Sequence, residues 1–180
     1  MNDDPDDGGP VVAGIRSAVD LAVDRLRAVD AQTEALATYV PSRQVMLVIR
    51  KEPALLPVGR VWRLGVFLLD QDGILSATGA TTRAVPPGHR GFQSNSAEER
   101  RGYRAAAFRG PFAPGETINF DAAAIDLDPE ALRTATGPLF VNGGRALVRW
   151  NPAATESTSV DFGTYLAERV SLLIDPPERA

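Results

Sequence analysis

Apolar side chains recur at helical spacing near the N-terminus of the chain. These positions lie three, four or seven residues apart, at Val12, Ile15, Val19, Leu26 and Val29. Such spacing places them on one side of an amphipathic helix. We expect this helix to continue or restart through Leu36 and Tyr39 and to end before Pro41, because proline disfavours helical geometry in the residue before it.

Two further helices are predicted later in the chain. Ser96 and Glu99 fit a capping box, in which a hydroxyl and a carboxylate each bond a backbone N–H at a helix start. We expect that helix to run to about Phe108, with Gly110 and Pro111 ending it. Helical spacing returns at Phe162, Leu166, Val170 and Leu173, before two prolines. A short helical turn is expected at 128–132 (DPEAL).

Strand patterns occupy the middle of the chain. Residues 45–49 form a short apolar run that predicts a strand, and the following KEPALLPVG predicts a loop. Residues 61–69 are apolar at most positions, which is typical of one largely buried strand. The turn at Gln71, Asp72 and Gly73 then predicts a hairpin with a second strand over 74–83.

Two more strand regions follow the second helix. Residues 117–127 alternate, with Ile118, Phe120, Ala122 and Ala124 on one face. The triplet Asn142-Gly143-Gly144 separates two apolar runs, 139–141 and 146–150. Asparagine and glycine tolerate positive φ, so this triplet predicts a hairpin turn.

Together these elements predict an α+β fold. We expect an antiparallel or mixed sheet of about five to six strands with three main helices packed on it. Residues 1–10 are acidic and read as a disordered tail, 11–176 as a single domain, and 177–180 as a C-terminal tail. The first ten residues lack the basic start and apolar run of a secretory signal, and we expect a cytoplasmic protein that does not contact membranes.

Composition excludes several kinds of chemistry. The chain of 180 residues has no cysteine, which removes disulfides, thiolate nucleophiles and thiolate metal sites. Its net charge of −4 disfavours nucleic acid as a partner. Asp70 and Asp72 lack the spacing of a calcium loop and suit a hairpin turn. Asp121, Asp126 and Asp128 are carboxylates near one strand, but we expect no metal site and no cofactor.

Basic residues concentrate between Arg83 and Arg109. This window holds six arginines and two acids, a balance of +4, whereas the remainder of the chain carries −8. Arg100 and Arg104 are neighbours on a helix, and the N–H groups after Ser96 add to anion binding. The candidate ligand-binding residues are Arg83, Arg90, Arg100, Arg101 and Arg104. An acidic protein or a small anionic ligand is the expected partner, unless these arginines pair with acids elsewhere in the fold.

An enzyme is the alternative. His89 is the only histidine, and histidine is the side chain whose ordinary pKa lies near neutrality, which suits a general base. A hydrolase of amidohydrolase type would require His89, the nucleophile Ser94 and Asp121 to converge in one pocket. No G-x-S-x-G motif supports this arrangement. The leading interpretation is therefore a non-catalytic binding protein, and the catalytic interpretation remains open.

Three segments carry a resemblance to known proteins. They are VGRVWRLGVFLL, TRAVPPGHRGFQSNSAEERRGYRAAAFRG and GRALVRWNP. In these segments the chain resembles a set of short, uncharacterised actinobacterial proteins, some of them labelled glutaminase. The resemblance implies no particular catalytic residue. Serine-dependent glutaminases use a Ser-x-x-Lys pair, whereas Val48 stands three positions before Lys51, the only lysine here.

Overall fold

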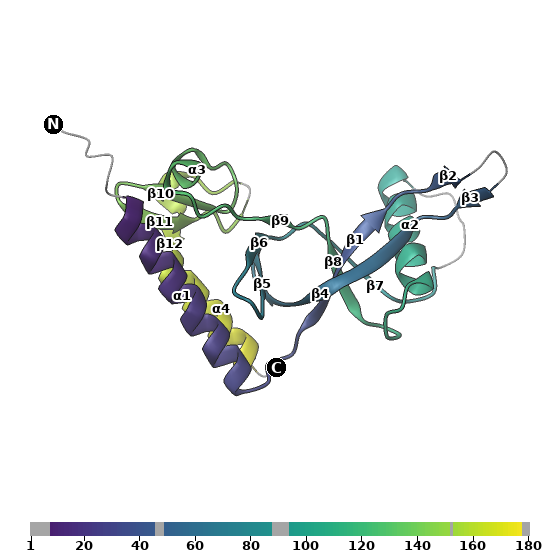
Figure 1. Ribbon diagram of the computed structural model, residues 1–180, viewed down its shortest axis with the longest axis horizontal. Helices are drawn as coiled ribbons and strands as arrows, with labels where there is room; N and C mark the ends of the chain where they lie inside the picture. Colours follow the sequence, from purple (N-terminus) through teal and green to yellow (C-terminus); the bar gives the residue numbers. More distant parts are fainter. Residues whose placement is uncertain (1–7, 46–48, 88–93, 152, 178–180) are drawn as a thin grey trace. The chain divides into compact units, whose positions relative to one another are not determined.

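The structure is a computed structural model in which residues 8–45, 49–87, 94–151 and 153–177 are described (Figure 1). Over these residues the elements are α1 (Gly8–Ala28), β1 (Glu34–Val40), β2 (Arg43–Val45), β3 (Ile49–Lys51), β4 (Ala54–Leu64), β5 (Phe67–Asp70), β6 (Leu75–Ala77), β7 (Ala80–Arg83), α2 (Asn95–Arg109), β8 (Thr117–Phe120), β9 (Ala123–Ala124), α3 (Pro129–Thr134), β10 (Leu139–Asn142), β11 (Arg145–Val148), the 3₁₀ turn η1 (Glu156–Thr158), β12 (Val160–Asp161) and α4 (Phe162–Ile174). The α+β class is confirmed.

The main sheet is mixed, as expected, with seven strands in the order β7-β8-β1-β4-β5-β6-β9. β1 runs parallel to β8 and antiparallel to β4. β10, β11 and β12 form a separate sheet, and β2 pairs with β3. The chain divides into two compact units: unit 1 (Met1–Gln32, Trp62–Ala77 and Ala123–Ala180) and unit 2 (Thr33–Val61 and Thr78–Ala122). β4 passes from unit 2 into unit 1, and the expected single domain stays a prediction.

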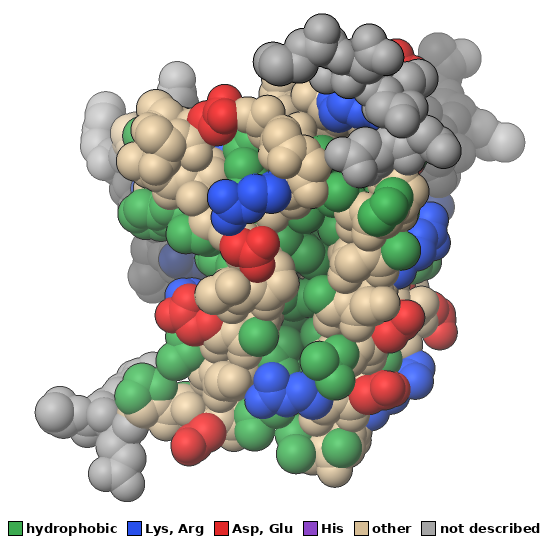
Figure 2. Space-filling view, turned by 90° about the vertical axis from the view of Figure 1, so that its left-hand side faces the viewer, with side chains coloured by type: hydrophobic (Ala, Val, Ile, Leu, Met, Phe, Trp, Pro, Cys, Tyr) green, Lys and Arg blue, Asp and Glu red, His purple; other side chains and the backbone are tan. Residues whose placement is uncertain are grey.

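Unit 1 has its own hydrophobic core, built around the helices α1 and α4. From α1 the core takes Ile15, Val19 and Leu26, and from α4 it takes Phe162 and Val170. The outer face of these two helices also carries apolar side chains, which gather along the face seen in Figure 2. Leu21 and Leu172 are among the exposed ones. The helical spacing therefore identified the buried side of both helices, except at Val29, which lies beyond the end of α1 and is 52% exposed.

Unit 2 is a two-layer structure in which α2 covers one face of the strands β7, β8, β1 and β4. Its core joins Ala106 and Ala107 of α2 to Ile118 and Phe120 of β8. Tyr103 of α2 extends this core, with its ring centroid 4.8 Å from that of Phe120. Because small alanines face the sheet, α2 lies close to the strands and its opposite side is left exposed.

Two expectations near the N-terminus are wrong. Residues 8–10 belong to α1 rather than to a tail, while residues 1–7 lie outside the described part. α1 also ends at Ala28 and does not continue through Leu36 and Tyr39, which lie in β1. Asp30 has φ of 49°, and the Ala31 N–H bonds the carbonyl of Leu26, so the chain turns out of the helix there.

The strand boundaries need correction as well. The expected loop at 51–59 is mostly strand, because β4 begins at Ala54 and accommodates Pro57 beside a bulge at Val58, which has no partner in β1. The single strand expected over 61–69 is two strands, β4 and β5. They are separated by Gly65, whose φ of 67° makes the turn. The strand expected over 74–83 is likewise divided, into β6 and β7.

Both expected hairpin turns are present. β5 pairs with β6 across residues 70–74, where one carboxylate oxygen of Asp70 accepts the N–H groups of Asp72 and Ile74 at 2.9 and 2.8 Å. β10 pairs with β11, and both Gly143 and Gly144 have positive φ. The carboxylate of Asp70 is thus used in local hydrogen bonds of the turn.

Candidate functional site

The helix α2 begins earlier than its sequence pattern predicts. Its N-cap is Ser94, whose hydroxyl makes no capping bond and lies 3.1 Å from the hydroxyl of Ser96. The capping box of Ser96 and Glu99 is therefore wrong. Glu99 instead accepts a hydrogen bond from the hydroxyl of Tyr103, one turn further along, at 2.9 Å. The helix ends as expected, with Gly110 at its C-cap.

The expected arginine surface is divided by the fold. Arg101 pairs with the Glu98 carboxylate through both Nε and Nη2. Arg109 donates to the backbone carbonyl of Pro53 at 2.7 Å. Arg83 is exposed on β7 next to the buried Thr82, so it points away from the sheet face that α2 covers. Arg90 lies outside the described residues.

Two of the predicted arginines remain together on the outer side of α2. Arg100 and Arg104 are both exposed and four residues apart, so their side chains are neighbours. Within the described part of the chain, neither makes a hydrogen bond or an ion pair. Phe108 follows after another four residues, and it is 51% exposed. These three residues form one stripe along the exposed face of α2, which we call the α2 stripe.

The acids of α2 are already engaged by other side chains. Glu98 holds Arg101, and Glu99 accepts the Tyr103 hydroxyl. That hydrogen bond, followed by burial of the phenol, raises the pKa of Tyr103 above its ordinary value. Tyr103 therefore stays a neutral donor to Glu99 at neutral pH. Glu98 and Glu99 thus bond side chains of α2 other than Arg100 and Arg104.

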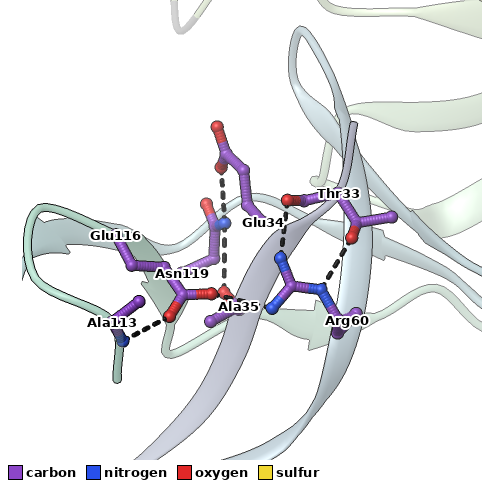
Figure 3. Close-up of polar contacts among 7 residues, drawn as sticks. All are labelled: Thr33, Glu34, Ala35, Arg60, Ala113, Glu116 and Asn119. Atoms are coloured by element: carbon purple, nitrogen blue, oxygen red, sulfur yellow. Dashed lines mark hydrogen bonds and ion pairs between the residues drawn. The ribbon is translucent and has the colours of Figure 1, made fainter. Parts of the chain in front are cut away.

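Other acids of unit 2 are held in a polar network at the strands β1, β4 and β8 (Figure 3). Arg60 donates through Nη1 to Glu116 at 2.7 Å, and through Nε and Nη2 to the hydroxyl and carbonyl oxygens of Thr33. Nearby, the buried amide of Asn119 donates to Glu34 at 2.7 Å. These contacts connect the three strands and use the carboxylates of Glu34 and Glu116 within the fold.

The charge of the chain separates along the boundary between the units. Unit 2 contains ten basic and six acidic residues, a balance of +4, and unit 1 contains nine basic and seventeen acidic residues, a balance of −8. The excess of arginine seen in the sequence is thus a property of a whole folded unit. A basic unit favours association with negatively charged partners.

Of the three catalytic candidates, the structure describes Ser94 and Asp121. His89 lies outside the described residues. The Ser94 hydroxyl is exposed and contacts only Ser96 among the described residues. Asp121 is exposed at the end of β8 with φ of 55°, a conformation that serves the turn beside Gly79. No base is positioned to activate Ser94 within the described part, so the hydrolase stays an untested alternative.

The carboxylates after β8 have local structural uses. Asp126 accepts the N–H of Asp128, and Asp128 caps α3 by accepting from Glu130 and Ala131. Among the described residues, no three acidic or histidine side chains are grouped as metal ligands. No helix in the described ranges is long and apolar enough to cross a membrane.

Sequence reasoning missed Phe108, which it treated only as the end of a helix. Phe108 lies four residues after Arg104 and eight after Arg100, so it lies on the same exposed side of α2. The orientation of α2 could have been inferred from the alanine pair at 106 and 107.

Comparison with known proteins identifies no relative: the chain matches no family model, no curated protein and no solved structure. The resemblance to the actinobacterial set stays a prediction. The class that the structure defines is the fold class, α+β.

Proposed function

We propose that this chain is a non-catalytic binding protein that docks an acidic surface of a partner protein against the α2 stripe. The observation that carries the proposal is the pair Arg100 and Arg104, exposed side by side while the acids of the same helix are engaged elsewhere. Guanidinium groups give strong, charge-assisted hydrogen bonds to carboxylates. The basic balance of unit 2 adds a long-range attraction for such a partner.

Phe108 favours a protein over a small anion as the partner. A phosphate or a free carboxylate group has no apolar surface that could pack against an aromatic ring placed one turn beyond the arginines. Protein interfaces are enriched in both aromatic and arginine side chains, often where a ring is desolvated beside a charged contact. The half-exposed ring of Phe108 extends the stripe from two charges to a mixed apolar and basic surface.

The test measures binding of a fluorescently labelled peptide rich in glutamate and leucine, with inorganic phosphate as a second probe. The double variant Arg100→Gln, Arg104→Gln should weaken peptide binding by about tenfold or more, equivalent to about 1.4 kcal/mol. Phe108→Ala should weaken peptide binding and leave any phosphate binding unchanged. The peptide arm thus distinguishes a protein surface from a simple anion site.

Arg101→Gln is the matched control for the single variants Arg100→Gln and Arg104→Gln, because each removes one positive charge from the same helix, in this case at a residue already paired with Glu98. It should reduce binding much less than either of those single variants. A loss as large as theirs would mean that only the total charge of α2 matters. An affinity for the peptide that is unchanged in all these variants would refute the α2 stripe as the docking surface.

A further inference from the structure

Unit 1 contains a cavity of about 430 Å³ that the sequence patterns did not indicate. Three segments form its walls: the β4–β5 turn with Gly65 and Val66, the segment around Trp150 and Val160, and the polar residues Glu168 and Arg169 of α4. A volume of roughly 300–1,000 Å³ is typical of sites for small molecules. The cavity therefore has the size of a ligand site.

One wall of the cavity is apolar and held in place. Trp150 is 50% exposed, although its indole Nε1 donates to the carbonyl of Thr158 at 3.1 Å. The hydrogen bond fixes the edge of the ring and leaves a face open. Val160, also partly exposed, lines the same cavity. Such a wall suits a flat or branched apolar group.

The lining of the cavity also includes an incompletely satisfied guanidinium, that of Arg169. The Arg169 guanidinium lies over the ring of Tyr165, 5.1 Å from its centroid, and Nη2 is 3.2 Å from the Glu168 carboxylate. Its Nε–H is shielded from solvent and has no hydrogen-bond partner in the described part of the chain. A buried donor without an acceptor is uncommon and costs free energy.

From these features we propose that the cavity binds a small carboxylic acid with an aromatic or branched apolar body. The body lies against Trp150 and Val160, and the carboxylate accepts hydrogen bonds from the guanidinium of Arg169. This site is independent of the α2 stripe, since it lies wholly in unit 1.

Glu168 sets the strength of this site. Its ion pair with Arg169 is formed between adjacent residues, and the two side chains are 59% and 33% exposed, so the pair is weak. A ligand carboxylate competes with Glu168 for the same guanidinium. Removing the charge of Glu168 should therefore tighten binding of an acid, a change that a purely structural role of Glu168 would not produce.

The experiment titrates the full chain with 3-phenylpropionate and, as a matched neutral probe, 3-phenylpropionamide. The fluorescence of Trp150 reports binding, because the only other tryptophan, Trp62, is 2% exposed. We expect saturable quenching by the acid that is lost in Trp150→Phe, with the amide at least about tenfold weaker. Ligand-observed NMR measures the same affinities without the tryptophan signal.

Two variants of α4 decide the assignment. Arg169→Gln should lower the affinity for the acid to that for the amide, and Glu168→Gln should raise the affinity for the acid about threefold without changing that for the amide. Glu168 is on the surface, so its variant remains informative if Arg169→Gln unfolds. Equal binding of acid and amide, no saturable binding, or no effect of Glu168→Gln on the acid would overturn the proposal.

Discussion

The hydroxyl oxygen of Tyr165 in α4 lies 3.1 Å from the backbone nitrogen of Val66 and accepts its hydrogen bond. Val66 is in the turn between β4 and β5, 99 residues earlier in the chain. The Tyr165 ring is buried and packs at 5.8 Å, edge to face, against Phe67. One side chain thus secures the turn both through its apolar ring and through its polar tip.

Tyr165→Phe should lower the free energy of unfolding by about 1 kcal/mol, because the ring packing is kept while the Val66 N–H loses its acceptor. Urea unfolding followed by circular dichroism measures this change. A variant as stable as the wild type would show that water replaces the hydroxyl at no cost.

Gly65→Ala should be more damaging than a usual glycine replacement. The φ of 67° costs a non-glycine residue about 1–2 kcal/mol, and the new Cβ would lie 2.1 Å from the Tyr165 hydroxyl. The steric contribution to this loss of stability should be smaller in the double variant Gly65→Ala, Tyr165→Phe, because the clashing oxygen is then absent. Strictly additive losses in a double-mutant cycle would contradict this coupling.

Gly143→Val should destabilise the β10–β11 hairpin by about 1–2 kcal/mol for a conformational reason alone. Gly143 has φ of 52°, while a Cβ there would meet no atom within 4 Å. Gly137→Val is the matched control, since that position is equally open and its φ is not positive. Urea unfolding measures the free energy of unfolding of both variants. Similar losses at the two glycines would show that the positive φ is not the cause.

Stability should depend on pH through Glu116. The hydrogen bond from Arg60, assisted by the Ala113 N–H and opposed by partial burial, lowers the pKa of Glu116 from its ordinary value of 4.5. A lowered folded-state pKa contributes stability that is fully present above pH 4.5 and is lost as the pH falls through the folded value. The stability difference between wild type and Glu116→Gln should therefore shrink below pH 4.5. A difference that is constant across the acid range would exclude Glu116 as the titrating group.

Binding of the acidic peptide to the α2 stripe should weaken with salt. Exposed charges are screened over about 8 Å at physiological ionic strength and over about 3 Å at 1 M. Wild-type affinity should fall steeply over this range, whereas the Arg100→Gln, Arg104→Gln variant should show a flatter dependence. Parallel curves for the two proteins would place the electrostatic contact elsewhere.

The sequence predicted the long helices better than the strands for an identifiable reason. In α1 and α4 large aliphatic side chains mark the buried side over several turns. In β1 the buried positions are Ala35 and Ala37, which are too small to make alternation visible beside Leu36. The turn at Gly65 was hidden in another way, because it is flanked directly by the apolar residues Leu64 of β4 and Val66 before β5.

The candidate site was predictable only in part. The four-residue spacing of Arg100 and Arg104 is enough to identify them as neighbours on a helix. Whether they face water depends on which side of α2 packs on the sheet, and that choice also decides the exposure of Phe108. The cavity in unit 1 brings Val66, Trp150 and Arg169 together from distant segments, a juxtaposition that no local pattern contains.

The strand β4 contributes side chains to both hydrophobic cores. Leu55, near its start, is buried in the core of unit 2, and Trp62 and Leu64, near its end, are buried in the core of unit 1. Detaching this strand would open both cores at once, so neither can lose β4 while the other keeps its full packing. In hydrogen exchange, the amides of β4 should exchange only through the largest opening the protein undergoes, and a cavity made at Leu55 should speed exchange at Leu64 as well.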